Sequence, residues 1–172
     1  MSASSTPSKP ARACVALGSN IGDREGHIYG ALQSIGQLPD TTVLLHSTLH
    51  ETAPVGPVPQ APFLNAAAVV RTSLEPVALM RALLEIERQR GRDRSAPDHQ
   101  HWGPRTLDLD LLLVERDGVS VVLDEPELTL PHPRMHERVF VLRPLAEVAW
   151  EWVHPGLGES VASLLGRIWR RT

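Results

Sequence analysis

Apolar positions change period along the chain, and the changes predict alternating strands and helices. Runs of apolar or alternating residues are typical of strands at 13–17, 42–51, 63–73 and 106–114. Ile28, Leu32 and Ile35 lie at helical spacing and predict a helix over 24–38, and a similar pattern predicts a second helix over 75–90. The order β-α-β-β-α-β is typical of a ferredoxin-like α+β sandwich, with helices packed on one face of an antiparallel sheet.

The C-terminal third predicts additions to this unit. Asp117-Gly118 forms a turn into a strand at 119–123, which makes a hairpin, and residues 128–130 form a short strand. Helices are expected at 134–148, with a kink or restart at Pro144, and at 160–170. We expect residues 13–172 to form one domain and the Ser/Pro-rich residues 1–12 to form a disordered tail.

Residues 52–62 contain four prolines and one glycine. Proline fixes φ and removes a backbone donor, so the segment is expected to be a shaped loop. A surface connection is one interpretation, but structureless segments of this length in a compact domain are often functional.

Composition excludes several classes of protein. The formal net charge of −3 argues against broad binding to nucleic acids or anionic membranes. No apolar run approaches the roughly 20 residues of a membrane span, and residues 1–12 lack the apolar core of a signal peptide. The single cysteine excludes a disulfide framework. We therefore expect a cytoplasmic protein. As a separate expectation, we predict that it is a monomer.

Asp108 and Asp110 are the strongest chemical signal. Residues i and i+2 of a strand face the same side, so both carboxylates should point away from the side of Leu107, Leu109 and Leu111. Two adjacent carboxylates repel each other unless a positive group lies between them. Mg²⁺ held together with nucleotide phosphates fits this need. The alternative is a solvated polar face paired with arginines.

Arginines surround this acidic pair in the sequence. Guanidinium groups bind phosphate in a bidentate way, so the cluster indicates a polyphosphate ligand, although any single member can be an ordinary surface charge. The members are Arg92, Arg94, Arg105 and Arg138.

Two further residues are open to two interpretations each. Glu87 lies on the face of its helix that should be apolar, so it is either an edge residue whose head reaches water or a functional acid. His132, between two prolines, is either structural or a donor to a phosphate.

Several motifs follow one another in order across residues 13–165. They are Ala16-Leu17-Gly18-Ser19-Asn20, Glu51 to Pro57, Phe63 to Ala67, Glu85-Ile86-Glu87 with Gly91 to Arg94, Trp102 to Asp110, and Leu128 to Arg138. Together they closely resemble the motifs of the 6-hydroxymethyl-7,8-dihydropterin pyrophosphokinase family.

The resemblance implies a role for each matching residue. Asp108 and Asp110 would hold two Mg²⁺ ions that bridge the phosphates of ATP, and Arg92 and Arg105 would join them in catalysis. Phe63 and Phe140 would sandwich the pterin, and the other pterin-binding residues would be Thr52, Pro54, Val55, Gly56, Asn65 and Trp102. ATP would be bound by Glu87, Arg92, Arg94, Arg105, Leu111, Thr129, His132 and Arg138.

The implied reaction is attack of the pterin hydroxymethyl oxygen on the β-phosphorus of ATP, with AMP as the leaving group, in folate biosynthesis. Closure of the loops that carry Trp102 and residues 52–62 would exclude water. Two alternatives stay open from the residues alone. A metal-dependent nucleotidyltransferase on the same fold would release pyrophosphate, and a non-catalytic nucleotide-binding module would show little turnover.

Overall fold

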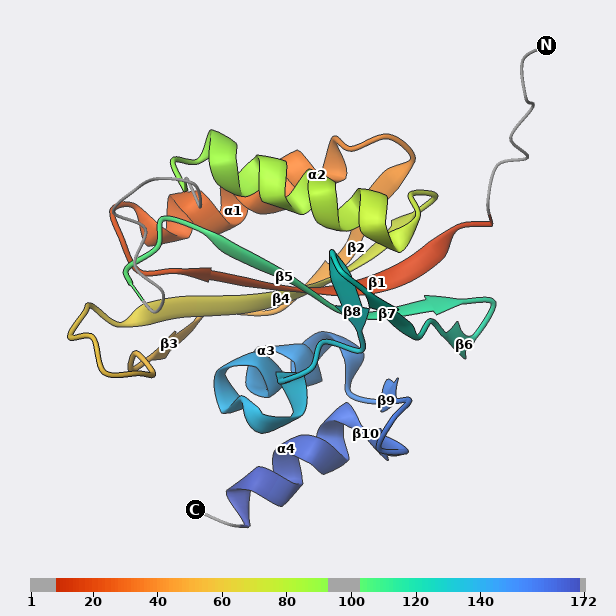
Figure 1. The fold of residues 1–172 in the computed structure, drawn as a ribbon. Helices are drawn as coiled ribbons and strands as arrows, with labels where there is room; N and C mark the ends of the chain where they lie inside the picture. Colours follow the sequence, from red (N-terminus) through yellow and green to blue (C-terminus); the bar gives the residue numbers. More distant parts are fainter. Residues whose placement is uncertain (1–8, 93–102, 171–172) are drawn as a thin grey trace.

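The computed structural model describes residues 9–92 and 103–170, and it is built around an antiparallel sheet (Figure 1). The strand order is β2-β4-β1-β5-β6, and β3 also pairs with β4. This order places the four strands of the predicted βαββαβ unit as a ferredoxin-like fold requires. The bounds are β1 Ala11–Ser19, β2 Thr41–His46, β3 His50–Thr52, β4 Phe63–Thr72, β5 Asp108–Arg116 and β6 Val119–Ser120.

The strand expected at 42–51 is divided into β2 and β3. Ser47 lies at the break, where its backbone N–H donates to the carbonyl oxygen of Ala67 at 2.8 Å. Its hydroxyl in turn accepts from the Ala67 N–H at 2.9 Å. The Ser47 hydroxyl thus replaces a backbone carbonyl as the acceptor for the Ala67 N–H. The chain can therefore turn at Ser47 while this N–H of β4 stays hydrogen-bonded.

Helices cover both faces of the sheet, whereas the sequence predicted one covered face. Helices α1 (Arg24–Gly36) and α2 (Pro76–Gln89) lie on one face, and α3 (Val139–Ala149) and α4 (Val161–Trp169) lie on the other (Figure 1). The second core contains apolar residues of the central strands, such as Cys14, Ala67 and Val69. Because β1 and β4 are apolar on both sides, each face needs a cover.

A bulge in β5 supplies part of the second core. Cys14 pairs with Leu113 and Val15 pairs with Leu111, so Leu112 is an extra residue on β5. Leu112 and Leu113 both pack in the second core, which breaks the alternation of β5 after Leu111. Asp108 and Asp110 precede the bulge and keep the alternation that the sequence predicted.

The C-terminal elements differ in detail from the prediction. The strand expected at 119–123 is split between β6 and β7 (Leu123–Glu125), and β7 pairs with β8 (Leu128–Leu130). The helix expected at 134–148 is a 3₁₀ turn, η1 (Met135–Glu137), followed by α3. Arg138, in an extended conformation, separates them, so the restart occurs before Pro144 and not at it. Strands β9 (Val153–His154) and β10 (Glu159–Ser160) precede α4.

Candidate active site

Two rows of residues across the three central strands form the floor of the candidate site. Gly18 of β1 pairs with Asn65 on one side and with Asp108 on the other. In the next row, Ala16 pairs with Ala67 and Asp110. Adjacent strands are about 4.8 Å apart, so Asn65 and Asp108 are separated by roughly 10 Å. Small residues in β1 therefore leave an open floor between an amide and two carboxylates.

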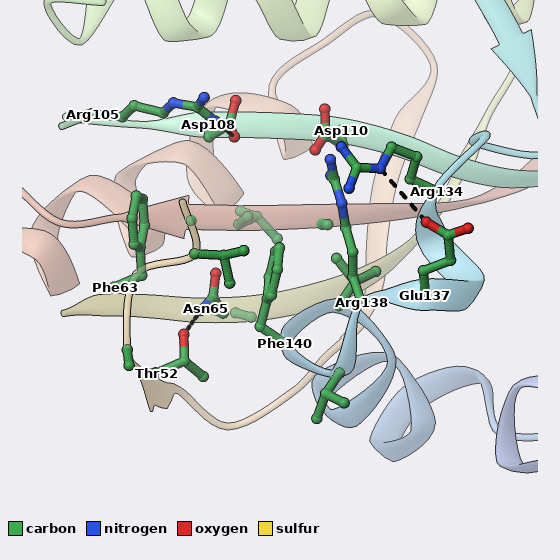
Figure 2. Close-up of a pocket in the computed structure, with 18 of the residues that line it drawn as sticks. Thr52, Phe63, Asn65, Arg105, Asp108, Asp110, Arg134, Glu137, Arg138 and Phe140 are labelled. Carbon is green, nitrogen blue, oxygen red and sulfur yellow. Dashed lines mark hydrogen bonds and ion pairs between the residues drawn. The ribbon is translucent and has the colours of Figure 1, made fainter. Parts of the chain in front are cut away.

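A cavity of about 470 Å³ lies over this floor, on the face that α3 partly covers (Figure 2). Asp108 and Asp110 point into it from β5, as the strand alternation predicted. The other predicted site residues that line it are Thr52, Val55, Phe63, Asn65, Arg105, Arg138 and Phe140.

Phe63 and Phe140 stand on either side of Asn65, and we call the space between them the aromatic slot (Figure 2). Both rings are half-buried, so each keeps a face for a flat ligand. The Asn65 Nδ2 donates to Thr52 Oγ1 at 2.6 Å, which fixes the orientation of the amide. A Cβ on Gly18 would lie 3.1 Å from Asn65 Oδ1, so glycine is needed to leave that oxygen accessible.

A network of charged groups lies at the other end of the floor. Arg92 donates to Asp108 and, at 3.2 Å, to Glu87 Oε1. Arg105 Nη1 donates to Asp108 Oδ2 at 2.5 Å. Glu87 is 1% exposed and Arg92 is 8% exposed, so water screens their interaction weakly.

Glu87 combines two structural contacts. Besides Arg92, its Oε1 accepts from the backbone N–H of Leu109 at 2.7 Å, so it joins α2 to β5 between the two aspartates. One of the two interpretations of Glu87, that it is an edge residue whose head reaches water, is therefore wrong. The carboxylate is buried and holds Arg92 against Asp108.

Arg138 connects the charged end of the cavity with the aromatic slot. Its guanidinium lies 5.8 Å from the ring centre of Phe140, within range of a cation–π interaction. Burial lowers the pKa of Arg138, while the nearby Asp110 carboxylate opposes that effect. The group remains a cation at neutral pH, since arginine starts from a very high pKa.

His132 is held in its neutral form. Burial, together with the positive charge of Arg138, lowers its pKa from 6.5 to about 4. Its Nδ1 accepts from the N–H of Arg134 at 3.2 Å, so the ring proton lies on Nε2. A neutral histidine with its proton on Nε2 is suited to donate to a phosphate oxygen.

Comparison with known proteins identifies the family. Residues 14–150 match the model of 7,8-dihydro-6-hydroxymethylpterin-pyrophosphokinase (HPPK). The chain is 46% identical over 136 residues to a Bacillus subtilis protein named 2-amino-4-hydroxy-6-hydroxymethyldihydropteridine pyrophosphokinase, covering 79% of this chain and 77% of that protein. A Pseudomonas aeruginosa protein of the same name is 43% identical over 138 residues, covering 80% of each. The chain belongs to the HPPK family.

Solved structures agree with this assignment at the level of the fold. A crystal structure of HPPK-DHPS in complex with substrates matches with a TM-score of 0.69 at 13% identity, covering 94% of this chain and 44% of that one. Plasmodium falciparum HPPK-DHPS with pteroate matches with a TM-score of 0.70 at 16% identity, covering 97% and 44%. The chain thus spans less than half of these longer proteins and shares the fold of one part.

The residues present fit the Mg²⁺ that an HPPK-family enzyme would use with ATP. Two carboxylates point into one cavity from the same strand face, and arginines stand beside them. Within residues 9–92 and 103–170, no group of three or more His, Cys, Asp or Glu side chains is arranged to hold a metal ion. Two carboxylates suffice for Mg²⁺ when phosphate oxygens and water complete its coordination.

Several residues predicted from the HPPK resemblance lie away from the cavity lining. Leu111 is 1% exposed and packs in the core on the α1–α2 side, so its side chain faces away from the cavity. Thr129 lies on β8 and pairs with Asp124. Pro54 and Gly56 belong to the proline-rich loop beside the slot, and Gly56 has a φ of 119°, which favours glycine. Arg94 and Trp102 lie outside the described residues.

The cavity is also lined by residues for which no role was predicted from the sequence. These are chiefly Gly18, Gln60, Gly103, Arg134 and Glu137. Arg134 immediately precedes η1 and pairs at 3.7 Å with Glu137 at the end of η1, and both lie beside Asp110 (Figure 2). Arg134 could have been predicted together with the other arginines, because it lies two residues after His132. The role of Gly18 could not be predicted from the sequence, because it depends on the strand register that places Gly18 between Asn65 and Asp108.

Proposed function

We propose that this chain transfers diphosphate from ATP to the hydroxymethyl oxygen of 6-hydroxymethyl-7,8-dihydropterin and releases AMP. The observation that carries the proposal is the shared floor of the cavity. It sets an aromatic slot with an anchored amide roughly 10 Å from two carboxylates and their arginines. A flat pterin in the slot would direct its hydroxymethyl group towards the charged end.

The slot would recognise the pterin by two kinds of contact. Stacking between Phe63 and Phe140 supplies affinity for any flat aromatic ligand, and hydrogen bonds distinguish a pterin from others. Asn65 would read the ring edge with Oδ1, because its Nδ2 is engaged with Thr52. Backbone groups of Ala53 to Gly56 would complete the hydrogen bonds.

The charged end would bind and align the triphosphate. Asp108 and Asp110 would hold Mg²⁺, for which we propose two ions, and bound Mg²⁺ would neutralise charge on the phosphate oxygens. Arg92, Arg105 and Arg138 would bind phosphate oxygens, and His132 would donate from Nε2. Positioning and charge neutralisation would supply most of the rate enhancement.

The reaction exchanges one P–O bond for another and releases the proton of the attacking hydroxyl. The hydroxymethyl oxygen of the pterin bonds to the β-phosphorus, and the bond from that phosphorus to the oxygen bridging to the α-phosphorus breaks. AMP leaves with that oxygen, and the hydroxyl proton is released. We assign no general base.

The proposal is tested by incubating the protein with ATP, Mg²⁺ and the hydroxymethyl pterin. We expect AMP and the pterin diphosphate in equal amounts. Release of pyrophosphate in place of AMP would indicate a nucleotidyltransferase, and binding without either product would indicate a nucleotide-binding module.

The two carboxylates are tested by Asp108→Ala and Asp110→Ala, which should each abolish turnover while the circular dichroism spectrum is retained. Glu125→Ala, on the exposed β7–β8 hairpin, is the control and should keep the rate. A near-normal rate in either Asp variant would exclude the metal role.

Three further properties concern location, oligomeric state and nucleic-acid binding. Over residues 9–92 and 103–170, the chain forms no helix that is both long enough and apolar enough to cross a membrane. The substrates are small and water-soluble, and the charge of the chain is slightly negative. We propose a cytoplasmic monomer that binds these two small molecules and does not bind nucleic acid.

A further inference from the structure

Asn20, immediately after β1, is bound on two sides by segments that are distant in sequence. Its Nδ2 donates to Gln60 Oε1 at 2.9 Å and to the carbonyl oxygen of Ala61 at 3.0 Å. Its Oδ1 accepts from the backbone N–H of Arg105 at 2.7 Å. Its own N–H donates to the carbonyl oxygen of Arg105 at 3.0 Å. The residue is 5% exposed, so these bonds replace water almost completely.

The partners leave no freedom in the orientation of the Asn20 amide. The Arg105 N–H can only donate, so the oxygen must face it, and the Ala61 carbonyl can only accept, so the NH₂ group must face that side. Aspartate has the same shape but no donor. Asparagine is therefore the residue that can connect both segments at this length.

These two segments form different halves of the cavity. Thr52, Val55 and Gln60 line it from the proline-rich loop, beside the aromatic slot. Gly103 and Arg105 line it from the segment that leads to Asp108. Asn20 is absent from the described residues that line the cavity, so it can influence a ligand only through these segments.

Arg24 holds the two ends of the proline-rich loop together. Its guanidinium donates to the carbonyl oxygen of Pro62 at 2.8 Å and to Glu51 Oε2 at 2.9 Å. The loop is therefore closed at its base by Arg24. The contacts of Arg24 stay at the loop, whereas those of Asn20 connect the loop to the Arg105 segment.

We propose that Asn20 is a positioning residue that couples binding of the pterin to binding of the nucleotide; this inference rests on the proposed function. A pterin in the slot orders the loop that carries Gln60 and Ala61. Through Asn20 this ordering extends to the backbone of Arg105, which then contacts phosphate with less conformational entropy left to lose. By linkage, the nucleotide must strengthen pterin binding by the same factor.

The test is calorimetric titration of the protein with 6-hydroxymethylpterin, a stable oxidised analogue. It is done with and without Mg²⁺ and α,β-methylene ATP, in which the bond that breaks is blocked. In the unmodified chain we expect the nucleotide to lower the Kd of the pterin about fivefold or more. Reverse titration, with the nucleotide added to the pterin complex, should give the same factor.

The decisive variant is Asn20→Asp. It keeps the acceptor for the Arg105 N–H but places a carboxylate oxygen against the Ala61 carbonyl, so only the loop side of the connection is lost. We expect the coupling factor to fall to about one, while each ligand alone binds within about threefold of its original Kd. Asn20→Ala should lose the coupling as well. A purely structural defect would weaken the binding of each ligand alone and leave the coupling factor unchanged.

Gln33→Glu is the matched control, because it makes the same amide-to-carboxylate change on an exposed position of α1, on the far side of the sheet. It should retain the coupling. The inference is overturned if Asn20→Asp keeps the full factor, or if the unmodified chain binds both ligands with no coupling. In either case the proposed function stands. Absence of pterin binding, together with absence of AMP formation, would overturn both proposals.

Discussion

Glu87 shows how much a single buried charge depends on its partners. Its carboxylate accepts from Arg92 and from the Leu109 N–H, and it is 1% exposed. Glu87→Gln keeps an oxygen that can accept from Leu109 but removes the negative charge, so of the two carboxylates that contact Arg92 only Asp108 remains, and Arg105 also contacts Asp108. Removing one partner of a buried ion pair costs about 3 kcal/mol or more.

We therefore expect Glu87→Gln to lower the free energy of unfolding in urea by about 3 kcal/mol with an unchanged m-value. Glu85→Gln is the control on the same helix. Glu85 pairs with Arg88 on the surface, and its removal should leave the unfolding midpoint unchanged. Equal midpoints for Glu87→Gln and the unmodified chain would show that the buried pair contributes nothing net.

The lowered pKa of His132 makes a prediction about pH. The folded chain binds this proton only near pH 4, whereas the unfolded chain binds it near pH 6.5. Between these values the unfolded state carries more protons, so stability must fall as the pH falls through this window. The contribution of this one group is at most about 3 kcal/mol.

His132→Asn can replace the acceptor for the Arg134 N–H without titrating. We expect its free energy of unfolding to change less between pH 6.5 and 4 than that of the unmodified chain, when both are measured by urea unfolding. All other titrating groups are common to the two proteins, so the difference reports on His132. Parallel curves would mean that the histidine is not held neutral by the fold.

At the level of elements, Glu147 of α3 fastens that helix to the segment leading into β3. It accepts from the Thr48 N–H at 2.8 Å and from His50 Nε2 at 2.5 Å. Helix α3 carries Phe140, and β3 ends at Thr52, which anchors Asn65. The two sides of the aromatic slot are therefore held in register by a contact outside the slot.

Loss of this contact should affect the pterin more than the chemistry. We expect Glu147→Gln to raise the KM for the pterin by about tenfold while kcat changes by less than about threefold, because the reacting groups on β5 are untouched. Steady-state AMP formation measures both constants. Glu151→Gln, just beyond the end of α3, should change neither constant. A fall in kcat at constant KM would place Glu147 in the phosphate half of the site.

Over the whole molecule, the sequence predicted what depends on local periodicity. The alternation of Leu107 to Leu111 fixed the direction of Asp108 and Asp110, and the helical patterns located α1 and α2. The role of Asn20 was beyond this reasoning because its partners lie 41 and 85 residues away. The break at Ser47 and the second covered face likewise depend on contacts between elements, which one-dimensional patterns do not contain.

The whole molecule should also report on metal through its stability. A ligand that binds only the folded state at 100 times its Kd adds about 2.7 kcal/mol, or roughly 5–10 °C in Tm for a chain of this size. We expect α,β-methylene ATP with Mg²⁺ to give such a shift. With EDTA the shift should nearly vanish, because the triphosphate would then face Asp108 and Asp110 without a cation between them.

Asp110→Asn separates this effect from general loss of affinity, since it removes one repelling charge and should bring back part of the shift in EDTA. An equal shift with and without Mg²⁺ would mean that the arginines alone bind the nucleotide and that the two carboxylates have another task.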